Sequence, residues 1–505
     1  MGKKYDVIVV GAGNAGLAAA ANTAKAGLST LLLEKHNLPG GCASSFRRGR
    51  FEFEPSLHEL CSVGTKERPN TVYKVFDSLG AKIDWRYEHN IFRVICKGKK
   101  GYDVTLKAGI EDFCSSVDAA VPGCKENVRA FLALKKKIDK AIDYIYAKKG
   151  HPNPLTMILK HSDFMRVAGH SVEQVMTALG IPKAAQDLIN TYWGYLGVPT
   201  DELNAMHFLN MVHDYVVDGA AMPHLRSHEL SLALTDVIRK NGGEIRYNSE
   251  VTKFLYNEDG SAAGVEVNGE KIYAREIISN VIPNNVFNRS DMKYLPKENV
   301  KLANAREFGI SVATVYLGLD CTAEELGMKD YTVFVVGDPD PRVQYNKRSE
   351  DGLYIVNCLN NVVPDSSPDG TCTLFFTIPV FGNDVPKDLR PEDYKKYKNA
   401  LAKKYIEDYE KLSGMSIMPH IEEISVATPV TFARYLGTPE GTIYGYKLSG
   451  WDNLMARTAA EKTDYAIPGL NFCGGHYIRG DGYSCAYIMG EMIGKRVASR
   501  LKGGA

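Results

Sequence analysis

The stretch that decides the fold is residues 5–16, which read YDVIVVGAGNAG. Its first six residues form a β-branched apolar run, the pattern of a strand buried on both faces of a parallel sheet. The Ala-rich residues 17–26 predict a helix directly after the glycines. Residues 31–33 predict a second strand, which ends on Glu34. This order of strand, GxGxxG turn, helix, strand and acid predicts a dinucleotide-binding βαβ unit.

Each residue type in this unit has a physical role. Gly11 permits the tight turn, Gly13 lets the backbone approach a pyrophosphate, and Gly16 lets the helix pack closely on the sheet. The N-terminus of the helix offers free N–H groups and positive potential to the phosphates. Glu34 accepts hydrogen bonds from a ribose. The predicted dinucleotide contacts here are Gly11, Gly13, Asn14, Ala15, Gly16, Glu34 and Lys35.

Composition limits the class of protein. The 505 residues are 44% hydrophobic and 24% charged, which excludes disordered, collagen-like and disulfide-framework chains. The net charge of +1 gives no global field that favours nucleic acid, so we expect no nucleic-acid partner. The ten cysteines include no CxxC pair and predict reduced thiols in a cytoplasmic protein without a signal peptide. We predict no metal site and no membrane-spanning segment.

Further motifs follow the dinucleotide unit. A Gly-Gly pair stands at 40–41, and residues 53–59 read FEPSLHE. Residues 242–251 read GGEIRYNSEV, residues 469–475 read GLNFCGG, and residues 480–483 read GDGY. Together these stretches resemble the flavoprotein family of phytoene desaturases, carotenoid isomerases and retinol saturases, within the amine-oxidase-like superfamily.

The resemblance implies an FAD-dependent oxidoreductase of the α/β class, with a discontinuous Rossmann-type FAD-binding domain and an α+β substrate-binding domain. It implies an FAD-binding domain at 1–90, 225–285 and 445–505, and a substrate domain at 91–224 and 286–444. The cofactor contacts that it adds are Gly40, Gly41, Ser45, Val251, Gly474, Gly482 and Tyr483.

Some positions depart from the family pattern. Glu54 and Ser56 stand where the family has Asp and Gly, and Gly475 stands where its C-terminal strand motif has Asp. Residues 221–228 read AMPHLRSH and lack the family's glycine pair. One hypothesis is that Arg226 and His224 bind a substrate carboxylate there, since a guanidinium pairs bidentately with one. The alternative is a capping or surface loop.

The chemistry that the resemblance implies is hydride transfer at flavin N5, for which the protein positions the substrate. A desaturase also needs a group that takes a proton, and a saturase needs one that gives it. His58 is the first candidate, because it lies in the segment that resembles the flavin-adjacent loop and its pKa shifts easily. Glu59 is the second. Other candidates precede the last helix: Tyr477, Arg479 and Asp481.

Four functions are open at this point. The favoured one is desaturation, saturation or isomerisation of a C–C or C=C bond in an apolar, carotenoid- or retinoid-like polyene, with NAD(P)H or another redox partner as electron source. The alternative is a redox-neutral isomerase of an unsaturated carboxylic acid such as a fatty acid. A third is an amine oxidase, and a fourth is a non-catalytic prenyl-protein escort.

A basic helical region lies at 125–169. It holds ten Lys and Arg against four Asp and Glu, and its apolar residues recur at near-helical spacing. Two interpretations stay open: peripheral contact with an anionic membrane that delivers an apolar substrate, or an ordinary solvated face.

Overall fold

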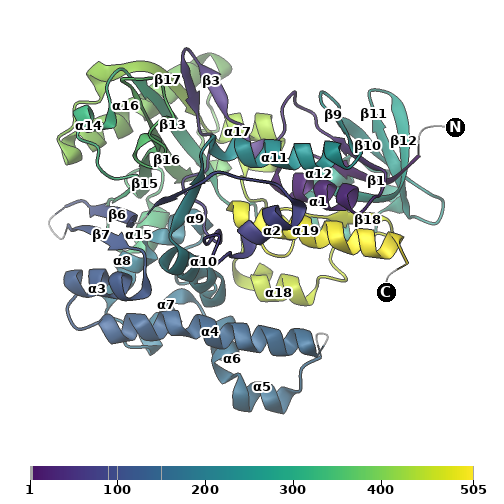
Figure 1. Cartoon of the computed structure of the whole chain (residues 1–505), viewed down its shortest axis with the longest axis horizontal. Helices are drawn as coiled ribbons and strands as arrows, with labels where there is room; N and C mark the ends of the chain where they lie inside the picture. The colour runs from purple at the N-terminus through teal and green to yellow at the C-terminus, as the bar shows by residue number, and fades with distance from the viewer. Residues whose placement is uncertain (1–3, 89, 99–100, 149–150, 481, 504–505) are drawn as a thin grey trace.

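The computed structural model describes residues 4–88, 90–98, 101–148, 151–480 and 482–503. Two seven-stranded sheets form the body of the molecule, and a group of helices extends below them (Figure 1). This mixed α/β architecture confirms the predicted fold class. In the described part of the chain, no helix is long and apolar enough to cross a membrane.

The first sheet has the strand order β10-β11-β12-β1-β2-β9, and β18 pairs with β12. Its strands are β1 (Lys4–Val10), β2 (Thr30–Leu33), β9 (Glu244–Arg246), β10 (Val251–Tyr256), β11 (Ala262–Val267), β12 (Glu270–Ser279) and β18 (Leu470–Phe472). The central strand β1 runs parallel to both β2 and β12, as its β-branched sequence predicts. Three separate parts of the chain thus build one sheet. The domain boundaries stay a prediction.

Two helices pack against each other beside this sheet. They are α1 (Asn14–Lys25) and the C-terminal α19 (Gly482–Leu501), and Figure 1 shows them side by side on the right. Their backbones approach so closely that a Cβ at Gly490 would lie 2.2 Å from the carbonyl oxygen of Ala15. This contact fixes α19 against the N-terminal end of α1. Two more helices belong to this body: α2 (Thr71–Leu79) and α11 (Arg226–Lys240).

The contact between α1 and α19 predicts the effect of one substitution. We expect Gly490→Val to lower the free energy of unfolding by at least about 1–3 kcal/mol, because the added atoms overlap the backbone of α1. Ser499→Val, at an exposed position of the same helix, is the matched control and should change stability by less than about 0.5 kcal/mol. Urea unfolding of both variants measures this; equal stabilities would show that the helices can separate without cost.

The second sheet has the order β17-β13-β16-β15-β14-β6-β7 and is antiparallel except between β14 and β6. Its strands are β6 (Asn90–Cys96), β7 (Asp103–Lys107), β13 (Ser311–Leu319), β14 (Thr332–Val336), β15 (Leu353–Cys358), β16 (Cys372–Val380) and β17 (Ile421–Ala427). Every residue of β13 and β16 is buried. One long helix, α16 (Tyr394–Ser413), packs beside this sheet. Two separate two-stranded sheets are also present: the hairpin of β3 (Phe46–Arg48) and β4 (Phe51–Phe53), and the long-range pair of β5 (Trp85–Glu88) and β8 (Ala220–Pro223).

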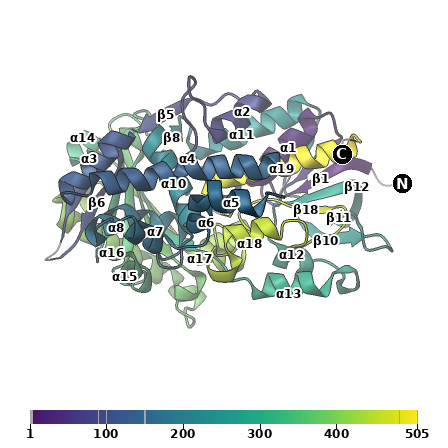
Figure 2. The same ribbon diagram turned by 90° about the horizontal axis from the view of Figure 1, so that it is seen from below.

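Helices form the lower part of the molecule in Figure 1, and in Figure 2, the view from below, α4 and its neighbours lie toward the viewer. They are α3 (Ile110–Ala120), α4 (Lys125–Ala147), α5 (Pro154–Lys160), α6 (Ser162–Ala168), α7 (Val172–Ala178), α8 (Lys183–Ile189), α9 (Trp193–Leu196) and α10 (Ala205–Asp218). The predicted basic region is therefore three helices, α4 to α6. The remaining helices are α12 (Pro283–Asn288), α13 (Lys297–Ala305), α14 (Ala323–Leu326), α15 (Pro341–Asn346), α17 (Pro429–Leu436) and α18 (Leu454–Ala459).

Candidate active site

A large cavity runs between the first sheet and the helical part of the molecule. Its volume is about 1430 Å³, larger than the ~300–1,000 Å³ typical of a pocket for one small ligand. Residues of the glycine turn line one part of it, and side chains of α4, α6, α9 and α10 line another. The cavity is therefore large enough for a dinucleotide and a second molecule.

The glycine turn forms the dinucleotide end of the cavity. Gly11 has a φ of +92°, and a Cβ at Gly16 would lie 2.0 Å from the carbonyl oxygen of Gly11. A Cβ at Gly13 would lie 2.5 Å from Nδ2 of Asn280. Gly13 is the N-cap of α1 and offers no side chain to the first turn, which contains no acid. The N–H groups of this turn, including those of Asn14 and Ala15, are thus available to an anion.

The Gly-Gly pair lies directly on this turn. The N–H of Gly40 donates to the carbonyl oxygen of Ala12 at 2.7 Å. A Cβ at Gly40 would lie 2.3 Å from the carbonyl oxygen of Ala43, and one at Gly41 would lie 3.4 Å from Cα of Gly13. Gly40 is therefore required by its own tight turn, whereas a side chain at Gly41 would lie against Gly13.

Acidic and basic side chains border the same end. Glu34 is buried at the tip of β2, where its two oxygens accept hydrogen bonds from the N–H of Ala12 at 2.7 Å and of His36 at 2.9 Å. Lys35 also lines the cavity, and burial lowers its pKa. Val251 lines it at the start of β10, with its carbonyl oxygen held by Arg289 at 2.8 Å.

The C-terminal strand and helix close this end. Gly474, with a φ of +103°, lines the cavity together with Gly482 and Tyr483 at the start of α19. The hydroxyl of Tyr483 donates to the carbonyl oxygen of Cys42 at 2.8 Å. A Cβ at Gly475 would lie 2.3 Å from the carbonyl oxygen of Tyr444. The family's Asp therefore has no room at this position, which explains its replacement.

These residues fit an FAD molecule. An open helix N-terminus suits the pyrophosphate, the glycines allow close backbone approach, and Glu34 provides the acceptor for a ribose. Thirteen of the fourteen predicted cofactor residues lie here: twelve line the cavity, and Gly16 sits in the turn itself. Ser45 is the exception, because it is buried outside the lining.

Glu59 is the acidic group in the middle of the cavity wall. It is buried, and the hydroxyl of Tyr195 donates to its Oε1 at 2.8 Å. Its Oε2 has no hydrogen-bond partner among the described residues. Burial raises the pKa of Glu59 well above its ordinary value, more than the Tyr195 hydroxyl lowers it. Burial therefore favours the protonated form of Glu59.

His58 lies beside Glu59 in the wall. Its ring stacks against Tyr195 and Phe375, with centroids 5.5 and 5.6 Å apart, and its Nε2 contacts Oγ1 of Thr377 at 2.7 Å. Burial lowers the pKa of His58 to about 3. It is a neutral imidazole at physiological pH and has no second proton to give.

Three predicted residues lie away from the cavity. Arg226 is buried, but its Nη2 donates to the carbonyl oxygen of Ser366 and its Nη1 lies 3.7 Å from Oε2 of Glu52. His224 contacts Asp365 at 2.8 Å, and the hydroxyl of Tyr477 donates to the carbonyl oxygen of Glu461 at 3.1 Å. None of the three lines the cavity. The hypothesis of a carboxylate site at Arg226 therefore loses its basis.

Two further candidates precede α19. Arg479 lines the cavity, whereas Asp481 lies outside the described residues.

The structure gives a role to Glu54, which stands where the family has Asp. Its buried carboxylate accepts hydrogen bonds from the N–H of Leu57 at 2.8 Å and from the N–H and Oγ of Ser227, both at 2.8 Å. It thereby ties the loop that carries His58 and Glu59 to the N-terminus of α11. Ser56, the neighbouring departure, contacts the Tyr483 hydroxyl at 3.0 Å.

Several polar residues of the cavity wall were not predicted from the sequence, among them Tyr195, His207, Asn210 and His476. The first three come from α9 and α10, in a region without a recognisable motif. Asn210 Oδ1 and His476 Nε2 have no hydrogen-bond partner among the described residues. Only His476 carried a sequence signal, since it directly follows the GLNFCGG strand.

Buried histidines predict sensitivity to acid. Burial lowers the pKa of His58 and His476 to about 3 and that of His207 to about 4, whereas an unfolded His has a pKa of ~6.5. The unfolded state then binds more protons, so the free energy of unfolding is largest above about pH 6.5 and falls as the pH drops toward these values. His476→Gln should reduce this slope by up to about 1.4 kcal/mol per pH unit. Urea unfolding from pH 7 to 5 measures it, with exposed His151→Gln as control; equal slopes would contradict the prediction.

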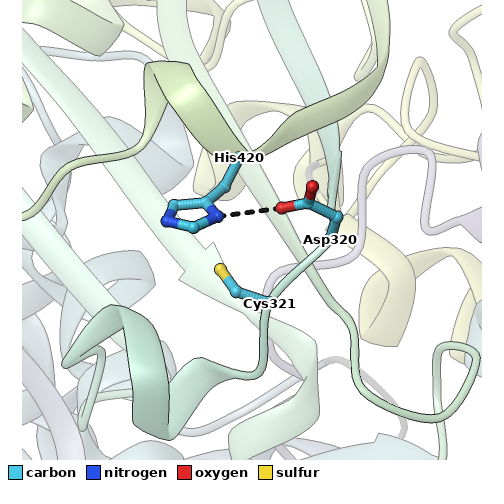
Figure 3. A group of neighbouring side chains, drawn as sticks. All are labelled: Asp320, Cys321 and His420. Atoms are coloured by element: carbon cyan, nitrogen blue, oxygen red, sulfur yellow. Dashed lines mark hydrogen bonds and ion pairs between the residues drawn. The ribbon is translucent and has the colours of Figure 1, made fainter.

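One group of potential metal ligands lies outside the cavity (Figure 3). Asp320 and Cys321 follow β13, and His420 precedes β17. His420 Nδ1 lies 2.8 Å from Oδ1 of Asp320, and the N–H of Asp320 donates to the carbonyl oxygen of His420 at 2.9 Å. Burial raises the pKa of the Cys321 thiol to about 11, so it stays protonated. The group joins two strand ends, and we assign no metal to it.

The N-terminal unit matches a family model, and known proteins are similar to this chain over most of its length. Residues 9–79 match the model of an NAD(P)-binding Rossmann-like domain. All-trans-retinol 13,14-reductase of Danio rerio is 25% identical, over 87% of this chain and 77% of its own length. The chloroplastic prolycopene isomerase of Daucus carota is 24% identical, over 99% of this chain and 81% of its own length.

Solved structures share the fold. An oxidoreductase from Methanosarcina mazei superposes with a TM-score of 0.65 at 16% identity, over 98% of this chain and 100% of its own. A redesigned putrescine oxidase superposes with a TM-score of 0.63 at 17% identity, over 98% of this chain and 99% of its own. At such identities the likeness concerns the fold alone.

The glycine turn, the sheet built from three parts of the chain and the named relatives together indicate the class of protein, an oxidoreductase with FAD as its cofactor. Within this class, the chain is similar to the phytoene desaturase and retinol saturase-like flavoproteins. The resemblance seen in the motifs is thereby confirmed.

Proposed function

We propose that this enzyme desaturates, saturates or isomerises a C–C or C=C bond of an apolar polyene of the carotenoid or retinoid type. The observation that carries the proposal is the continuity of the cavity from the dinucleotide turn, past Glu59, to an apolar wall. The side chains of that wall include Ile142, Ile145, Phe164, Leu196, Met206 and Met211. Such a wall suits a long apolar substrate, and relatives named for retinol and prolycopene support this class.

The chain's own residues supply proton transfer and positioning. FAD, when bound, supplies the hydride chemistry. Glu59 is the proposed proton donor, or acceptor in the reverse direction, because it lines the cavity, its Oε2 has no hydrogen-bond partner among the described residues, and burial raises its pKa and so favours the acid form. Since the Tyr195 hydroxyl donates to Oε1, the acidic proton belongs on Oε2. A rotation of the carboxyl group then presents this proton to the cavity.

His58 is the proposed positioning residue. Its neutral ring, stacked between Tyr195 and Phe375, forms an aromatic wall next to Glu59. Its Nε2 holds Thr377. A flat conjugated substrate packs well on such rings, whose faces prefer offset stacking.

The redox partner and the cellular setting are also proposals. NAD(P)H or another redox partner would supply electrons for net reduction. All ten cysteines are free thiols, which supports a reducing compartment such as the cytoplasm. The fatty-acid isomerase alternative depended on Arg226, which lies outside the cavity lining, and we do not propose it.

The test is product analysis with the FAD-loaded enzyme. Retinol, a carotene and prolycopene are incubated separately with oxidised or reduced enzyme, and the products are separated by chromatography and mass. We expect at least one polyene to gain or lose two hydrogens, or to change double-bond geometry at constant mass. Turnover of an amine such as putrescine, with all polyenes unchanged, would contradict the proposal.

A further inference from the structure

An apolar patch lies on the outer surface of α5 and α6. Its members are Leu155, Ile158 and Leu159 on α5 and Met165 on α6, with exposed fractions of 63%, 62%, 71% and 52%. Among the described residues, no other eleven-residue stretch exposes four large apolar side chains. Contiguous exposed apolar residues mark interaction sites, whereas single ones need no explanation.

The patch is not required for the core beneath it. Met157 on α5 and Phe164 and Val167 on α6 are buried and hold the two helices to the rest of the protein. The exposed residues occupy the opposite side. Figure 1 shows α5 as the lowest element, projecting beyond α4, so a flat surface can reach it without meeting the body of the molecule.

The surroundings of the patch are positively charged. Residues 151–162 contain no Asp or Glu. Lys160 and Arg166 are exposed beside the patch and form no ion pair with a described residue. The nearby Asp163 is already paired with Lys137 at 2.7 Å. Apolar residues flanked by free cations are the combination that binds an anionic lipid surface.

The same part of the chain also contributes to the lining of the cavity. Phe164 of α6, Ile142 and Ile145 of α4, and His151 and Pro152 before α5 all line it. The outer side of this helical group therefore carries the patch while its inner side faces the cavity. The patch and part of the cavity lining thus belong to the same helices.

We propose that α5 and α6 dock on the surface of a bilayer that contains anionic phospholipid, and that the apolar substrate enters the cavity beside them. The docking depends only on the patch and its charges. The route of entry rests, in addition, on the proposed function. Neither step requires a helix that spans the membrane, since side chains of this kind insert only to the depth of the headgroups.

Vesicle flotation with the holoenzyme tests the docking. The probes are vesicles of phosphatidylcholine alone and of phosphatidylcholine with phosphatidylglycerol. We expect binding to the anionic vesicles, and a reduction of about ten-fold or more in the triple variant Leu155→Ser/Ile158→Ser/Leu159→Ser. The matched control is Met292→Ser/Met418→Ser/Ile424→Ser, three apolar residues exposed elsewhere, which should bind like the wild type.

A charge variant makes the test independent of the folding of the triple variant. Lys160→Glu/Arg166→Glu should lose the preference for anionic vesicles. Equal binding of wild type and both variants, or no binding by the wild type, would overturn the proposal. A dimer that the triple variant dissociates, without vesicle binding, would assign the patch to a second copy of the chain instead.

Turnover of detergent-solubilised and of vesicle-embedded polyene distinguishes a failure of the docking proposal from a failure of the proposed function. The triple variant should turn over a detergent-solubilised polyene at the wild-type rate but lose at least about ten-fold with vesicle-embedded polyene. If vesicles bind but no polyene reacts in either form, the docking stands and the proposed function fails. If both forms react equally well in the variant, the route of entry is wrong.

Discussion

Glu59→Gln should lower turnover of a polyene substrate by about 10²–10⁴-fold while FAD stays bound, because the variant keeps the shape of the side chain but has no acidic proton. The neutral amide suits the site, since burial there favours an uncharged side chain. The protein should therefore fold and load FAD normally. Single-turnover kinetics and flavin content, measured on the same preparation, separate a lost proton transfer from a lost cofactor.

The pH profile of kcat in two further variants tests the role of Glu59 independently. Tyr195→Phe removes the donor to Oε1, which raises the pKa of Glu59 further. If Glu59 donates a proton, kcat falls as the pH rises through its pKa, and this fall should move to higher pH in the variant. Exposed Glu258→Gln is the matched control and should leave the profile unchanged. Full kcat in Glu59→Gln would remove Glu59 from the mechanism.

Gly13→Asp should abolish FAD loading, with binding weakened by at least about 100-fold. A Cβ at this position already meets Asn280 at 2.5 Å, and the new carboxylate would place a negative charge where the helix N-terminus attracts phosphate. The measurement is flavin absorbance of the purified variant and titration of the apoprotein with FAD. Gly27→Asp, just past the other end of α1, is the matched control for the added charge: nothing lies within 4 Å of a Cβ there, and although a side chain at its φ of +79° costs stability, FAD binding should stay as in the wild type. FAD binding in Gly13→Asp as tight as in the control would contradict the account of the glycine turn.

Local motifs predicted the dinucleotide end well, because its parts are close in sequence or carry strong backbone requirements. The strand, turn and helix at 5–26, and Glu34 at the strand tip, are found where their spacing placed them. Whether Ser45 lines the cavity was harder to predict from the sequence, because no backbone requirement fixes which side of its loop faces the cavity. Its placement outside the lining follows from packing.

Long-range contacts explain most of what the sequence did not reveal. Arg226 is drawn away from the cavity by Ser366 and Glu52, which lie 140 and 174 positions away along the chain. Tyr195 meets Glu59 across 136 positions. No periodicity or motif encodes such pairs. The break between α4 and α5 is different, since Pro152 and Pro154 could have indicated it.

The most direct test of the central claim is chromatography of a carotenoid or retinoid after anaerobic incubation with oxidised and with reduced holoenzyme. The account predicts a change in the number or geometry of double bonds in at least one of the two incubations, and almost none with Glu59→Gln. Unchanged polyene in both incubations, with flavin fully loaded, would contradict the assignment of the apolar cavity to a polyene.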